Sequence, residues 1–267
     1  MSDANLSSCR AKLAYAKKKL DALKREISTF KETRPYYLDT RPGPPEFEWF
    51  LRIERPPPED FGIEAGGIAT NARSSLDYLV TQLAIANGVD RASALNKRSA
   101  RQFPIFLDEG DYRQARGRGK SYRELMLDRV SPRHKRYIDR FQPYQRGLQS
   151  APDDPLALLR AISDREKHRD PEAIIAVMRT LTLKFPVPEG AFLRAVFSTS
   201  KPLQDGDVLF SIATEKVVPG VQIGVEALGA EPDFDLAFLG ERVVTLDDLE
   251  RIVLHISHII DFFEVRI

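Results

Sequence analysis

A seven-residue repeat of apolar side chains in the first 30 residues most constrains how this chain can fold. Two apolar rows recur with this period, at Leu6, Leu13, Leu20 and Ile27 and at Cys9, Ala16, Leu23 and Phe30. This a/d pattern predicts one long helix with a continuous apolar seam. The seam is thin at the layers of Cys9 and Ala16. We therefore favour a helix packed antiparallel on the protein's own bundle over a dimerising coiled coil.

Periodic patterns place the other main elements. Apolar residues at helical spacing predict three further helices, at about 58–87, 155–168 and 246–264. Thr245 is placed to cap the last of these, and a short polar helix is expected to begin at Pro132. Alternating residues predict a strand near 47–53 and an antiparallel β-meander at about 178–240. The proline-rich residues 41–45 are expected to form a loop.

The order of helices, strands and a final helix predicts an α+β fold formed as a single unit, 1–267. Residues 1–170 are expected to be mainly helical, 173–243 to form the antiparallel sheet, and 246–264 to return to the helical bundle. The chain has 42% hydrophobic and 30% charged residues, which is typical of a globular protein with a sizeable core. It has one cysteine and no apolar run of ~20 residues. We expect a cytoplasmic protein without a disulfide framework or a membrane partner.

Two polar clusters interrupt the apolar helical patterns, at residues 71–78 and 163–170. Each contains two ionisable residues four positions apart, which lie on one face of a helix. The pairs, Arg73 with Asp77 and Asp164 with His168, continue stripes of small residues that allow close helix packing. We therefore expect the two helices side by side and the two pairs within a few ångströms of each other, partly out of water. Perturbed pKa values and functional sites are most common in such places. The candidate catalytic residues are Arg73, Asp77, Asp164, His168 and Arg169.

The net charge of +1 hides a strong separation of charge. Residues 97–146 contain 14 Lys or Arg against 6 Asp or Glu, whereas residues 202–250 contain 2 against 11. A basic segment of this kind is typical of a surface that binds RNA or DNA. The alternatives are that the basic and acidic segments face each other, within one subunit or across a homodimer, or that both are solvated surface.

Several short motifs resemble a family of uncharacterised bacterial proteins over about residues 45–170. They are Leu76-Asp77-Tyr78-Leu79, Phe103-Pro104-Ile105-Phe106, Gln142-Pro143-Tyr144 and Lys167-His168-Arg169. This resemblance implies no activity. A more remote similarity is to the HEPN superfamily, helical bundles that include metal-independent ribonucleases of toxin and defence systems. Their catalytic pattern is an arginine, four to six residues, then a histidine. Here Arg165 is too close to His168 and Arg160 is too far from it. The pairs Arg129 with His134 and Arg251 with His258 have the required spacing.

Three functions are consistent with these features. The first is an interaction or regulatory protein whose polar cluster only specifies how its helices pack. The second is an RNA-binding or RNA-cleaving protein that uses the basic segment 97–146. In that protein His168 would be the acid or base, and Arg73 or Arg169 would stabilise negative charge. The third is an enzyme in which Asp77, Asp164 and His168 hold a small ligand or a metal ion. The sequence contains no phosphate-binding glycine loop and no His-Glu-x-x-His motif, so we predict no cofactor and no metal ion.

Overall fold

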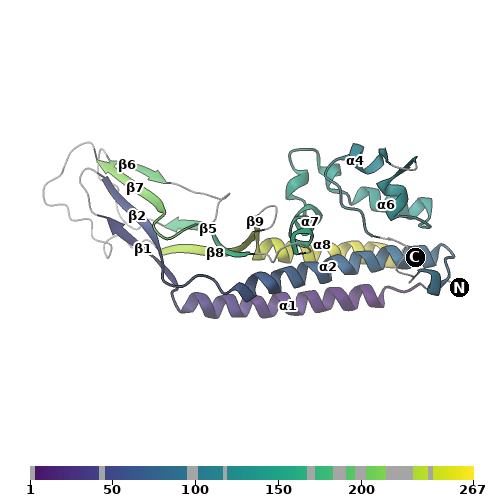
Figure 1. The fold of residues 1–267 in the computed structure, drawn as a ribbon, viewed down its shortest axis with the longest axis horizontal. Helices are drawn as coiled ribbons and strands as arrows, with labels where there is room; N and C mark the ends of the chain where they lie inside the picture. The colour runs from purple at the N-terminus through teal and green to yellow at the C-terminus, as the bar shows by residue number, and fades with distance from the viewer. Residues whose placement is uncertain are drawn as a thin grey trace.

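The computed structural model describes residues 4–41, 46–94, 102–116, 119–166, 172–182, 191–195, 203–214, 231–239 and 243–267. Three long helices run along the molecule, with a four-stranded sheet toward one end and a lobe of short helices toward the other (Figure 1). These helices are α1 (Ser7–Glu32), α2 (Glu59–Ala86) and α8 (Leu246–Glu264). Each packs against the other two. The α+β class, with a helical bundle, is confirmed.

Helix α1 packs antiparallel to α2. Lys12 Nζ donates to Asn71 Oδ1 at 3.3 Å, and Lys19 Nζ lies 3.1 Å from Glu64 Oε1. Residue numbers therefore increase along α1 where they decrease along the adjacent side of α2. The apolar rows of the heptad pattern face this interior: Leu6, Cys9, Leu13, Ala16, Leu20, Leu23 and Ile27 are all buried. The prediction that this seam packs on the protein's own bundle is confirmed.

Helix α2 continues through the pair Gly66-Gly67 without a break. A methyl group added at Gly67 would meet no atom within 4 Å. Close packing is therefore not the reason for a glycine at position 67.

The strands form two main sheets, both antiparallel. The first has the order β1 (Tyr36–Arg41), β2 (Glu46–Ile53), β7 (Val208–Thr214) and β6 (Ala191–Ala195). The second has the order β5 (Glu172–Thr182), β8 (Glu231–Leu239) and β9 (Val243–Thr245). The strands expected at 178–240 are thus divided between two sheets, because β7 pairs with β2 and β6 whereas β5 pairs with β8.

Three details of the strand prediction can be compared with these sheets. The strand expected near 47–53 is confirmed as β2. Strand β1, at 36–41, was not predicted. The part of the predicted meander at residues 221–225 lies outside the described residues. In the turn before β7, Gly206 has a φ of +88°, a left-handed conformation that favours glycine.

Short elements build the lobe that separates α2 from α7. They are α3 (Arg91–Ala94), α4 (Glu109–Arg113), β3 (Ala115–Arg116), β4 (Lys120–Ser121), α5 (Tyr122–Met126), α6 (Pro132–Arg140), η2 (Pro143–Arg146) and η3 (Ala151–Asp153). Helix α7 (Pro155–Glu166) follows and packs against α2 and α8. Helix α6 begins at Pro132, as predicted. Thr245 caps α8, also as predicted: its hydroxyl accepts from the Asp248 N–H at 3.1 Å, and the Asp248 carboxylate accepts from Thr245 N–H.

One cluster of buried apolar side chains joins the bundle to the first sheet. It contains residues of α1, α2, α7 and α8 together with Trp49 and Leu51 of β2 and Leu209 of β7. This shared core is in keeping with the single α+β unit predicted from the sequence. That the chain forms one domain stays a prediction. In the part of the chain that the structure describes, no helix combines the length and apolar character needed to cross a membrane.

We predict that Gly67→Ala raises the free energy of unfolding by up to about 1 kcal/mol, because glycine inside a helix costs about that much relative to alanine. The added methyl group has open space around it. Gly206→Ala is the contrasting variant: its φ of +88° is strained for alanine, so stability should fall. Urea denaturation of both variants measures the effect. A loss of stability in Gly67→Ala would contradict this account of α2.

Candidate functional site

A buried, extended segment, Phe103–Phe106, lies between the helices at the base of the lobe. Phe103 is fully buried and Ile105 is 4% exposed, yet the segment belongs to no sheet. Buried backbone N–H and C=O groups are costly unless they form hydrogen bonds. Four side chains from three parts of the chain provide these bonds. We call them the polar clamp: Arg73 and Asp77 of α2, Gln142 just before η2, and Arg160 of α7.

Arg73 and Asp77 bind the backbone of the same residue. Asp77 Oδ1 accepts from the Phe103 N–H at 2.8 Å, and Arg73 Nη2 donates to the Phe103 carbonyl at 2.6 Å. The two side chains also pair with each other, with 3.7 Å between Arg73 Nε and Asp77 Oδ1. Their side chains are 17% and 27% exposed. The predicted pairing on one helix face and the partial exclusion of water are both present.

Gln142 and Arg160 hold the rest of the segment. Gln142 Nε2 donates to the Pro104 carbonyl at 2.8 Å, while its Oε1 accepts from the Phe106 N–H at 3.2 Å. Arg160 Nη1 donates to the Ile105 carbonyl at 3.1 Å. The Phe106 carbonyl accepts from the backbone N–H of Tyr144 at 3.3 Å. All four carbonyls of the segment therefore have a hydrogen-bond donor.

The second predicted pair is only partly within the described residues. Helices α2 and α7 pack side by side, as predicted. Asp164 belongs to α7, but its side chain is outside the description, as are His168 and Arg169 in residues 167–171. The expected contact between the two pairs therefore stays a prediction.

Sequence reasoning did not select Gln142 or Arg160 as functional residues. A signal was present for Gln142, because Gln142-Pro143-Tyr144 and Phe103-Pro104-Ile105-Phe106 are two of the motifs that carry the bacterial family resemblance. In the structure these two motifs are bound to each other through Gln142. Arg160 had no such signal.

A second polar cluster lies beside the segment. Asp139 of α6 is buried and receives a two-pronged hydrogen bond from Arg123, at 2.9 Å from Nε to Oδ1 and 2.8 Å from Nη2 to Oδ2. The Tyr112 hydroxyl donates to Asp139 Oδ1 at 3.1 Å. Burial, followed by the negative charge of Asp139, raises the pKa of Tyr112. Tyr112 is thus a neutral hydrogen-bond donor at physiological pH. The cluster fixes α4, α5 and α6 to one another.

His255 of α8 is largely enclosed by other parts of the protein. His255 of α8 has a buried Nε2 without a hydrogen-bond partner in the described part of the protein. Burial lowers the pKa of His255; the Asp154 carboxylate opposes this effect, and the neighbouring Arg146 and His258 add to it. Among the residues that the structure describes, no group of three or more His, Cys, Asp or Glu is arranged to hold a metal ion.

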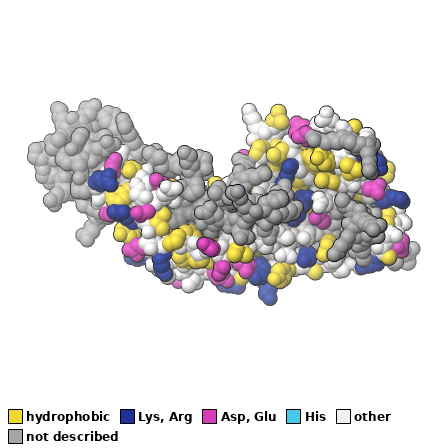
Figure 2. Space-filling model, viewed as in Figure 1, with side chains coloured by type: hydrophobic (Ala, Val, Ile, Leu, Met, Phe, Trp, Pro, Cys, Tyr) yellow, Lys and Arg dark blue, Asp and Glu magenta, His cyan; other side chains and the backbone are white. Residues whose placement is uncertain are grey.

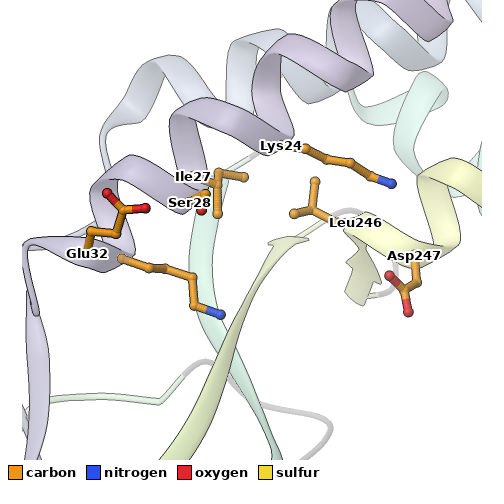
Figure 3. Close-up of a pocket in the computed structure, with 7 residues that line it drawn as sticks. Lys24, Ile27, Ser28, Glu32, Leu246 and Asp247 are labelled. Carbon is orange, nitrogen blue, oxygen red and sulfur yellow. The ribbon is translucent and has the colours of Figure 1, made fainter.

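A groove of about 580 Å³ lies between α1 and the start of α8 (Figure 3). Its lining combines basic, acidic and apolar side chains: Lys24, Ile27, Ser28, Lys31, Glu32, Leu246 and Asp247. Lys24 Nζ is bound to Glu250 at 2.7 Å. None of these residues was a sequence candidate, and none belongs to the polar clamp. This mixture of opposite charges indicates no particular class of ligand.

The chain matches no family model, and no curated protein or solved structure shows significant similarity to it. The resemblances to the bacterial family and to the HEPN superfamily therefore stay predictions. The features of the molecule that bear on its function are the geometry of the polar clamp and the distribution of charge.

We predict that Asp77→Ala lowers the free energy of unfolding by about 1–3 kcal/mol, because it leaves the buried Phe103 N–H without its acceptor. Asp77→Asn keeps an oxygen acceptor and loses only the charge, so its effect should be smaller. Asp21→Ala, at an exposed position of α1, is the matched control and should change stability by less than about 0.5 kcal/mol. Chemical denaturation gives all three values. Equal effects of Asp77→Ala and Asp21→Ala would contradict a structural clamp.

We predict that stability falls as the pH is lowered through about 6.5, the usual histidine pKa in an unfolded chain. The folded state holds the pKa of His255 below its ordinary value, so the unfolded state takes up the proton first. Stability is therefore greater above this pH than below it. His255→Leu removes this contribution, and unfolding measured at several pH values should show a weaker pH dependence than in the parent protein. An unchanged dependence would exclude His255 as its source.

Proposed function

We propose that this chain is an interaction protein in which the polar cluster around Arg73 and Asp77 positions its helices. One observation supports this choice over catalysis at that cluster: Arg73 and Asp77 both bind the backbone of Phe103. A catalytic arginine or carboxylate must direct its polar atoms at a substrate. Here Arg73 Nη2 and Asp77 Oδ1 are directed at the protein's own main chain.

RNA is the partner that we propose, bound through the basic segment 97–146. Strands β7 and β8, in the acidic segment 202–250, lie toward one end of the molecule, whereas α4 and α6 of the basic segment lie at the other (Figure 1). Strands β7 and β8 are therefore not placed to neutralise α4 and α6 within one subunit. The net positive charge of the basic segment favours an external polyanion, and the HEPN-like resemblance is in keeping with RNA. A homodimer, in which basic and acidic segments of two copies meet, is the second candidate.

The remaining parts of this proposal follow from the sequence. We retain the cytoplasmic location, where RNA is accessible. The ribonuclease alternative depends on His168, and the ligand or metal alternative depends on Asp164 and His168, whose side chains lie outside the described residues. Asp77, the third residue of the latter alternative, is bound to Phe103. No observation favours either alternative over binding.

The test is to incubate labelled random-sequence RNA with the protein and to divide each sample between a native and a denaturing gel. At about 50 mM salt we expect a retarded complex with intact RNA, and at about 200 mM a much weaker complex, because bound cations release counterions from phosphates. His168→Ala should bind RNA as the parent protein does.

Two results would contradict this proposal. RNA cleavage that is lost in folded His168→Ala and Arg73→Ala would support the ribonuclease. Absence of binding at low salt would exclude RNA, and sedimentation would then show whether a salt-sensitive homodimer accounts for the charge separation.

A further inference from the structure

One face of α6 presents arginines around a tyrosine. Arg133, Arg136, Tyr137 and Arg140 are spaced at i, i+3, i+4 and i+7, so they lie on one side of the helix. The three arginines are exposed and Tyr137 is partly exposed. Phe262, near the end of α8, and Arg266, just after α8, lie against this side of α6. We call these six residues the Arg–Tyr face.

The charges on the Arg–Tyr face converge on the Tyr137 ring. Arg133 Nε donates to the Tyr137 hydroxyl at 3.0 Å. The guanidinium carbons of Arg133, Arg140 and Arg266 lie 5.6, 5.8 and 5.9 Å from the ring centre. The hydrogen bond from Arg133, together with the positive charges of all three arginines, lowers the pKa of Tyr137. This is the effect expected of a strongly positive surface.

Among the described residues, no carboxylate pairs with Arg133, Arg136, Arg140 or Arg266. Other arginines of the same lobe do have acidic partners: Arg113 pairs with Glu109, Arg123 with Asp139, and Arg146 with Asp154. Within the described part of the lobe, these acids pair with arginines outside the Arg–Tyr face.

The Arg–Tyr face is held in place from two distant parts of the chain. His134 Nε2 is 3.1 Å from the carbonyl oxygen of Arg266, which ties the segment after α8 to α6. The Tyr137 and Phe262 rings pack edge to face with centres 5.2 Å apart, and Arg266 stacks over Phe262 at 3.8 Å. The aromatic rings and cations are therefore arranged before any partner binds.

We propose that the Arg–Tyr face binds single-stranded nucleic acid, with phosphates at Arg133, Arg136 and Arg140 and a base stacked beside Tyr137 and Phe262. This inference rests on the proposed RNA-binding function and assigns its site. Arginine matches phosphate geometry, and aromatic side chains stack with unpaired bases. An acidic peptide offers charge but no planar ring, and a duplex keeps its bases stacked inside.

The size and surroundings of the face are consistent with this partner. Arg133 and Arg140 are seven residues apart, about 10 Å along the helix axis, so they can contact different phosphates. In Figure 2, hydrophobic side chains gather over the lobe of short helices, with both basic and acidic side chains among them. A strand with exposed bases requires apolar and basic groups side by side, as the Arg–Tyr face provides them.

The test compares two variants that each remove two exposed positive charges. Arg133→Ala with Arg140→Ala changes the Arg–Tyr face, and Lys17→Ala with Lys18→Ala changes the exposed side of α1. Fluorescence anisotropy with a labelled RNA of about 20 nucleotides, a length that spans a full single-strand binding site, measures affinity at several salt concentrations. We expect the arginine variant to bind about tenfold or more weakly and its salt slope to fall by about 1.4, at about 0.7 per phosphate contact. The lysine variant should bind nearly as the parent protein does.

Tyr137 provides the second variant. Tyr137→Leu should weaken binding roughly fivefold or more if a base stacks there, whereas Tyr137→Phe, which keeps the ring, should have little effect. Circular dichroism and thermal unfolding confirm that each variant is folded. If Tyr137→Leu unfolds, the arginine variant alone decides whether the Arg–Tyr face binds the RNA.

Failure of this inference is distinguishable from failure of the proposed function. If the parent protein binds RNA and the arginine variant binds equally well, or no worse than the lysine variant, the Arg–Tyr face is not the site although RNA binding stands. If the parent protein does not bind at low salt, both fail. Equal competition by polyglutamate or by duplex RNA would overturn the assignment to single strands.

Discussion

The structure depends on one requirement: the buried backbone of Phe103–Phe106 must find hydrogen bonds outside any sheet. Its partners come from α2, from the residue before η2 and from α7, so the segment fixes these elements relative to one another. The same segment carries Phe106, whose ring packs 5.1 Å from that of Tyr112 and so connects the polar clamp to the cluster around Asp139. The lobe that presents α6 is positioned through these contacts.

Much of the helical part of the fold could be predicted from the sequence, because helix periodicity and capping are local properties. The heptad seam of α1, the start of α6 at Pro132 and the Thr245 cap of α8 are examples. Strand pairing is not local. β7 lies beside β2, about 160 residues earlier in the chain, and alternation of residues says nothing about which strands become neighbours.

The candidate site was predictable to a similar degree. The spacing of Arg73 and Asp77 correctly indicated a pair on one face that is partly out of water. It could not indicate their hydrogen-bond partner, which is the backbone of a residue 26 to 30 positions away. Because every residue has backbone N–H and C=O groups, the sequence carries no signal for which one is bound. In the polar clamp, the hydrogen-bonding groups of this partly buried charged pair are directed at the protein's own main chain.

The distances along the chain within the polar clamp also bear on folding kinetics. Its five bonds to the segment join residues 26, 30, 36, 38 and 55 positions apart, so none can form before long loops have closed. Closing such loops costs chain entropy before the bonds compensate for it, which slows folding. If the bonds form only after the folding transition state, weakening them accelerates unfolding and leaves the rate of folding nearly unchanged. In that case the polar clamp sets the unfolding rate, and with it how long the lobe and the bundle stay together in the native state.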